Sequence, residues 1–171
     1  MNLNKDVQKF IDNAKKVEKG HSLDLSLGED LSVAIMNLIG IEEHMFFTSQ
    51  KLGDTKYLEV LNSAREMRKE LMKKIVKEGQ GEVWCTSKHL LSASMRLMEV
   101  GTKCITKGDT KEANDYFKKS FDLYNLFWGL NLGMVESDPK KAKFEEKPIP
   151  EKNLMGTISQ TIGKILDCCR E

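Results

Sequence analysis

Three histidines and four cysteines are the residues of this chain best suited to hold a metal ion or to move a proton. Cys85 and His89 are four positions apart, so on a helix they would share one face. His44 follows Glu42 and Glu43 in another predicted helix. A thiolate, two imidazoles and a carboxylate would suit zinc, so His44, Cys85 and His89 are the candidate metal ligands. We favour the structural alternative, in which Cys85 is a small apolar residue and His89 a boundary residue.

A dinuclear iron or manganese centre would need a different pattern. In helix bundles it requires Glu-x-x-His on each of two helices and a glutamate on each of the other two. Only Glu18 and His21 have this spacing, and Gly20 interrupts it at a helix end. The sequence therefore argues against a dinuclear site.

The helix that carries His44 has a second stripe of residues, separate from its leucine-containing apolar face, and this stripe could line a pocket. Its members are Asn37, Gly40, His44 and Phe47, and a glycine there permits close approach of another helix or a ligand. The candidate residues for acid–base catalysis in such a pocket are Glu43, His44, His89 and Arg96. Sequence signatures of hydrolases, P-loop proteins, dinucleotide-binding proteins and zinc proteases are absent. We therefore expect no enzymatic activity, and keep a metal-binding or acid–base enzyme using His44 and His89 as the alternative.

Composition limits the partners and the location of the protein. The 171 residues suffice for one domain with appendages, and a net charge of +1 gives no global attraction to nucleic acid or anionic membranes. No apolar run approaches the roughly 18 residues of a membrane-spanning helix. The start, MNLNKDVQKF, has no apolar region typical of an export signal, so a cytoplasmic location with reduced thiols is expected.

RNA binding by the third long predicted helix is a further alternative. That helix has a basic flank, but glutamates interleave with the cations at the spacing of surface ion pairs, such as Glu66 with Lys69. We therefore interpret the flank as a solvated face and do not expect nucleic acid as a partner. Its basic residues are Arg65, Arg68, Lys69, Lys73 and Lys74.

Apolar residues recur with helical periodicity along most of the chain, and only three prolines are present. Four long helices are predicted to begin near residues 29, 56, 83 and 110, and to end near residues 53, 79, 107 and 133. The turn sequence Gly-Asp-Thr-Lys occurs at Gly53 and again at Gly108, where the glycine ends one helix and Asp-Thr caps the next. Half of the aromatic residues lie in the last of these helices, which we expect to be central to the packing.

Short connections make neighbouring helices antiparallel, so the expected fold is all-α: an antiparallel up-down four-helix bundle. The predicted organisation has four parts. These are an N-terminal amphipathic helix and an extended strap ending at Gly28 (1–28), the four-helix core (29–135), a charged linker containing prolines (136–150) and a C-terminal amphipathic helix (151–171).

The stretch from Leu97 to Phe127 resembles one tetratricopeptide helical hairpin. Its small and aromatic positions are occupied by Gly101, Gly108, Ala113, Phe117 and Ser120. It departs from that pattern at Leu97, where tryptophan is usual, and at Cys104, where tyrosine is usual. One unit does not make a solenoid, so the resemblance implies a close-packed antiparallel hairpin within the bundle.

The C-terminal amphipathic helix carries the main functional expectation. Its apolar stripe must be covered by its own bundle, by a protein partner or by a second copy, and its few cations disfavour a membrane surface. The expected function is a protein–protein interaction or assembly module. The predicted partner-binding residues are Leu154, Ile158, Ile162 and Ile165.

Overall fold

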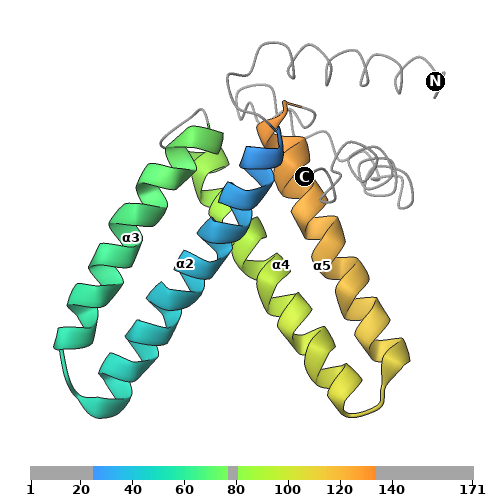
Figure 1. Ribbon diagram of the computed structural model, residues 1–171, viewed down its shortest axis with the longest axis horizontal. Coiled ribbons are helices and arrows are strands. Elements are labelled where there is room, and N and C mark those ends of the chain that lie inside the picture. The colour runs from blue at the N-terminus through green and yellow to red at the C-terminus, as the bar shows by residue number, and fades with distance from the viewer. Residues whose placement is uncertain (1–24, 77–80, 134–171) are drawn as a thin grey trace, which may run out of the picture.

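The computed structural model describes residues 25–76 and 81–133, and these form four helices (Figure 1). The predicted N-terminal helix, the linker and the C-terminal segment with Leu154, Ile158, Ile162 and Ile165 lie outside the described residues. No strand occurs in the described part of the chain, as the all-α prediction requires. The helices are α2 (Leu25–Leu52), α3 (Lys56–Ile75), α4 (Glu82–Thr106) and α5 (Thr110–Asn131).

The four helices form two hairpins that meet at one end. Helix α2 packs along α3, and α4 packs along α5. The two hairpins converge at an apex and diverge toward their turns, so the ribbon has the outline of an inverted V (Figure 1). Helices α2 and α4 make the main contact between the hairpins. This packing is compatible with a bundle, but the hairpins are not in contact along their whole length.

The hydrophobic core lies at the apex, where one end of every helix contributes to it. Phe127 and Trp128 of α5 are buried there, and their rings meet edge to face with centroids 5.2 Å apart. Their burial confirms the expectation that the aromatic-rich helix is central to the packing. The buried core residues are Ile35, Met36, Met72, Ile75, Val76, Leu91, Phe127, Trp128 and Leu132.

Helix α2 begins four residues earlier than the sequence pattern indicated. The alternation of Leu25 and Leu27 with polar residues predicted an extended strap ending at Gly28 and a helix starting near Glu29. The structure instead places Leu25 and Leu27 in the first turn of α2, with Gly28 buried inside the helix. A period of two over so few residues is weak, and packing at the apex outweighs the low helix propensity of glycine.

Both predicted glycine turns are confirmed, but the predicted side-chain cap forms only at the second turn. Gly53 and Gly108 follow α2 and α4 with φ of 63° and 81°, a left-handed conformation that favours glycine. The carboxylate of Asp109 accepts a hydrogen bond from the backbone N–H of Glu112 at 2.9 Å, which caps α5. At the other turn, Asp54 accepts from the backbone N–H of Lys56 at 3.0 Å, but Thr55, the N-cap residue of α3, makes no capping hydrogen bond with its side chain.

Small residues bring α4 and α5 close together. An ideal Cβ on Gly101 would lie 2.5 Å from Cε1 of Phe117, so any larger residue would require this ring to shift. Further along the pair, the hydroxyl of Ser94 donates to the backbone carbonyl of Ser120 at 2.9 Å, and Ser120 donates to that of Ser94 at 2.7 Å. These contacts explain why small residues recur in this hairpin.

None of the described helices is long and apolar enough to cross a membrane.

Candidate functional site

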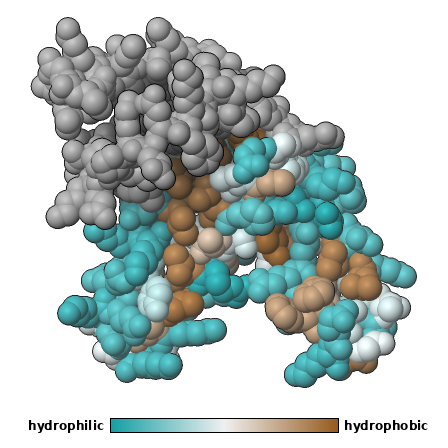
Figure 2. All heavy atoms as spheres, turned by 180° about the vertical axis from the view of Figure 1, so that it is seen from behind, coloured by the Kyte–Doolittle hydropathy of each residue, from teal (hydrophilic) through white to brown (hydrophobic). Residues whose placement is uncertain are grey.

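A pocket of about 490 Å³ lies between the hairpins, on the faces of α2 and α4 that flank the space inside the V. Figure 2 views the molecule from behind and shows that the space between the hairpins opens toward their two turns, with hydrophobic side chains on both hairpins. We call this site the inter-hairpin pocket. It is lined by Met36, Asn37, Gly40, Ile41, Glu43, His44, Met45, Phe47, Met95, Arg96 and Glu99.

The apolar part of the pocket is rich in methionine and partly open to solvent. Met36, Met45 and Met95 line it, and the ring of Phe47 is exposed at its edge, with 60% of the residue accessible. Methionine is flexible and polarizable, and such side chains recur on surfaces that bind helices of varied sequence. The pocket therefore has walls that can adapt to an apolar ligand.

The polar part of the pocket is an ion cluster that spans the hairpins. The guanidinium of Arg96 on α4 donates to the carboxylates of Glu43 on α2 and of Glu99 on α4. The hydrogen bond to Glu43 raises the pKa of Arg96, so its charge is retained. Two carboxylates face one guanidinium, so the cluster carries a net negative charge and does not offer a free cation to an anionic ligand.

The structure brings most of the predicted pocket stripe into this site. Asn37, Gly40, His44 and Phe47 all line it, together with the candidates Glu43 and Arg96. His44 is solvent-exposed at the pocket. The fourth candidate for acid–base catalysis, His89, is exposed on α4 and is not one of the lining residues.

The candidate zinc ligands do not converge. Within residues 25–76 and 81–133, no group of three or more His, Cys, Asp or Glu side chains is arranged to hold a metal ion. His44 lies at the pocket on α2, whereas Cys85 and His89 lie near the start of α4, a helix that begins at the apex. The set His44, Cys85 and His89 therefore does not form a ligand group in this structure.

On the other side of α2, a nearly buried ion pair ties this helix to α3. Arg68 donates from Nε to Oε1 of Glu42 at 2.5 Å and from Nη2 to Oε2 at 3.3 Å, and the side chain of Arg68 is only 4% exposed. The expectation that Arg68 belongs to a solvated basic flank is therefore wrong. Its position four residues after Ala64 and four before Met72, both buried, is the sequence signal that it lies on the packed stripe.

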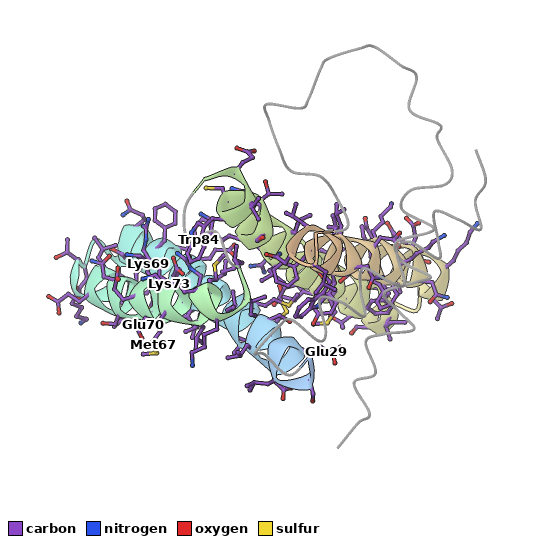
Figure 3. All side chains as sticks on the ribbon, turned by 90° about the horizontal axis from the view of Figure 1, so that it is seen from above. Glu29, Met67, Lys69, Glu70, Lys73 and Trp84 are labelled. Carbon is purple, nitrogen blue, oxygen red and sulfur yellow. The ribbon has the colours of Figure 1, made fainter. Side chains whose placement is uncertain are left out.

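The remaining part of the basic flank is solvent-exposed or paired. Lys69 donates to Glu66 at 2.9 Å, as the spacing predicted. Lys69, Glu70 and Lys73 lie along α3, and the exposed Met67 projects away from the helix (Figure 3). Mixed charge of this kind does not create the continuous positive stripe that binds a phosphate backbone.

The two cysteines in the described residues differ in environment. Cys85 is exposed, whereas Cys104 is partly buried with its Sγ 3.8 Å from a carboxylate oxygen of Glu112. Burial, followed by the charges of Glu112 and Asp109, raises the pKa of the Cys104 thiol. This thiol is therefore held in its protonated form, which is a poor nucleophile.

Comparison of the chain with protein-family models, curated proteins and solved structures found no match.

Two residues of α4 that line the pocket, Met95 and Glu99, were not predicted from the sequence. Both become part of the pocket only because the hairpins diverge, which exposes a side of α4 that a closed bundle would cover.

Proposed function

We propose that this protein is a non-enzymatic helical module for protein–protein interaction or assembly, and that the inter-hairpin pocket is its binding surface. The observation that supports this proposal best is the composition of the pocket. Three methionines and an exposed phenylalanine surround an ion cluster between two helices, which is a surface suited to an apolar partner with charged edges.

The partner whose chemistry fits the pocket is an amphipathic helix. Two diverging helices form walls between which a third helix can lie, presenting apolar side chains at i, i+4 and i+7. The net negative charge of the cluster formed by Glu43, Arg96 and Glu99 favours lysine or arginine beside the apolar stripe of that helix.

The proposal also includes four features expected from the sequence. They are an up-down bundle topology for the core, an amphipathic helix on each side of it, a tethered C-terminal helix that contributes partner contacts, and a cytoplasmic location. A module of this kind binds a partner through its pocket and through the stripe formed by Leu154, Ile158, Ile162 and Ile165.

Selection of helical peptides from a displayed library on the full chain tests this proposal. We expect the enriched peptides to combine an apolar stripe at helical spacing with flanking cations. Phe47→Asp should weaken their binding at least tenfold, because it places a charge in the apolar part of the pocket. Val60→Asp is the matched control, because Val60 is 49% exposed on α3 and does not line the pocket.

Failure of the selection to enrich any peptide would contradict the proposal. So would enriched peptides that bind the Phe47→Asp variant as tightly as the unmodified protein, because their binding site would then lie elsewhere.

A second candidate function, an acid–base enzyme, is favoured by one observation. Glu43 and His44 both line the pocket, which places a carboxylate and an imidazole beside one cavity. Against it, the Glu43 carboxylate already accepts from Arg96, which disfavours its use as a base. Small-molecule binding that His44→Ala abolishes, without any effect on peptide binding, would support the enzyme instead.

A further inference from the structure

We propose that residues 151–169 of this same chain dock in the inter-hairpin pocket. This inference rests on the proposed function, because it names an occupant for the same pocket. Three properties support it: the apolar spacing of the segment, its two lysines, and the length of chain that connects it to α5.

The apolar spacing of the segment suits a groove between two helices. Leu154, Ile158, Ile162 and Ile165 recur at intervals of four, four and three, which is the spacing of one helix face. Such a stripe can pack between the methionines of α2 and α4 that line the pocket.

Two lysines of the segment can pair with the carboxylates of the pocket. Lys152 and Lys164 lie beside the apolar stripe, and with Glu151 and Asp167 the segment 151–169 is neutral overall. The pocket contains Glu43, Arg96 and Glu99, with one more carboxylate than guanidinium. Lysines next to these carboxylates favour this pairing, and a segment with a net negative charge would be disfavoured at the same site.

The connecting chain is long enough for the segment to reach the pocket. The described chain ends at Gly133, just after α5, at the apex from which α2 also begins (Figure 1). There the hydroxyls of Ser32 on α2 and Tyr124 on α5 are 2.7 Å apart. Residues 134–150 span up to about 55 Å when extended. Helix α2, with 28 residues, is about 42 Å long, so every part of the pocket lies within reach.

Photo-crosslinking in the full chain tests the inference. The photoreactive amino acid p-benzoylphenylalanine replaces Phe47 at the edge of the pocket, and an equal mixture of unlabelled and ¹⁵N-labelled copies is irradiated and digested. We expect crosslinks from position 47 to peptides of residues 151–169, with both ends carrying the same isotope. The double substitution Ile158→Asp with Ile162→Asp should lower their yield at least tenfold.

A matched control places the same photoreactive residue at Val60, which is exposed on α3 outside the pocket. Its crosslinks to residues 151–169 should be at least tenfold fewer. Equal yields from both positions would overturn the inference. So would crosslinks that join different isotopes, which would assign the pocket to a second copy, and so would the absence of crosslinks to this segment.

Failure of this inference and failure of the proposed function give different results. If selected peptides bind the pocket but position 47 does not crosslink to residues 151–169, the module stands and its partner is another protein. If position 47 crosslinks to the segment within one copy but no peptide is enriched, the pocket is a site for internal docking alone.

Discussion

Glu42 and Glu43 are neighbours in the sequence, but their ion-pair partners lie in different hairpins. Glu42 accepts two hydrogen bonds from Arg68 of α3, within its own hairpin, and Glu43 accepts one from Arg96 of α4, across the space between the hairpins. The first pair is nearly buried and the second is about half exposed. Two adjacent carboxylates therefore have different physical roles, the first in holding a hairpin together and the second in shaping the pocket.

The buried pair predicts a large stability difference between two arginine substitutions. Arg68→Ala leaves the carboxylate of Glu42 without its partner in a largely buried position, so we expect a loss of about 3–5 kcal/mol in the free energy of unfolding. Arg96→Ala should lose less than about 1 kcal/mol, because its partners are solvent-exposed. Urea denaturation followed by circular dichroism measures both values.

Joint replacement of the buried pair provides the control. Glu42→Leu combined with Arg68→Met removes both charges and keeps apolar volume, so most of the lost stability should return. Equal losses for Arg68→Ala and Arg96→Ala would show that the contact between α2 and α3 is not buried as described.

Two glycines inside helices predict different effects of the same substitution to alanine. A Cβ at Gly101 would meet the ring of Phe117, and overpacking of this kind costs about 1–3 kcal/mol. The better helix propensity of alanine returns up to about 1 kcal/mol, so Gly101→Ala should be neutral to destabilising by about 2 kcal/mol.

At Gly40 nothing lies within 4 Å of an added Cβ, so Gly40→Ala should stabilise the protein by about 0.5–1 kcal/mol. Thermal unfolding of the two variants measures the contrast. A Gly101→Ala variant at least as stable as Gly40→Ala would contradict the close approach of α4 and α5.

The environment of Cys104 predicts the pH dependence of its alkylation. Burial, with the charges of Glu112 and Asp109, raises the pKa of this thiol, so at a given pH less thiolate forms and iodoacetamide reacts more slowly. Glu112→Gln removes one negative charge, lowers the pKa and should speed the reaction.

Lys107→Gln should act in the opposite direction, because the charge of Lys107 lowers the pKa of Cys104. Mass spectrometry of the peptide containing Cys104 gives both rates as a function of pH. A change of the same sign in the two variants would be inconsistent with the electrostatic assignment.

The helices and turns were predictable because their signals are local. Glycine readily adopts the left-handed conformation that follows α2 at Gly53 and α4 at Gly108. The cap formed by Asp109 depends only on residues within one helical turn. The stripe of Asn37, Gly40, His44 and Phe47 was also visible in the sequence, because residues on one helix face follow from helical geometry alone.

The opening between the hairpins and the burial of Arg68 were not predictable in the same way. Apolar periodicity indicates which faces are buried, but it does not give the angle between two hairpins. Val60 and Met67 lie at helical spacing with the core residues of α3 and are exposed, whereas Arg68 is charged and buried. The exposure of Val60 and Met67 and the burial of Arg68 depend on which residues of α2 lie opposite α3, and the sequence of a single helix does not specify this.

Methyl spectra of the methionines test most directly whether the pocket is the binding surface. A selected helical peptide is added to the full chain labelled at its methionine methyl groups, and the shifts are compared between methionines that line the pocket and methionines that do not. We expect Met36, Met45 and Met95 to shift, while Met67 and Met98, which are exposed elsewhere, stay unchanged. Shifts confined to Met67 or Met98, or no shift at the three pocket methionines at saturating peptide, would contradict the proposed binding surface.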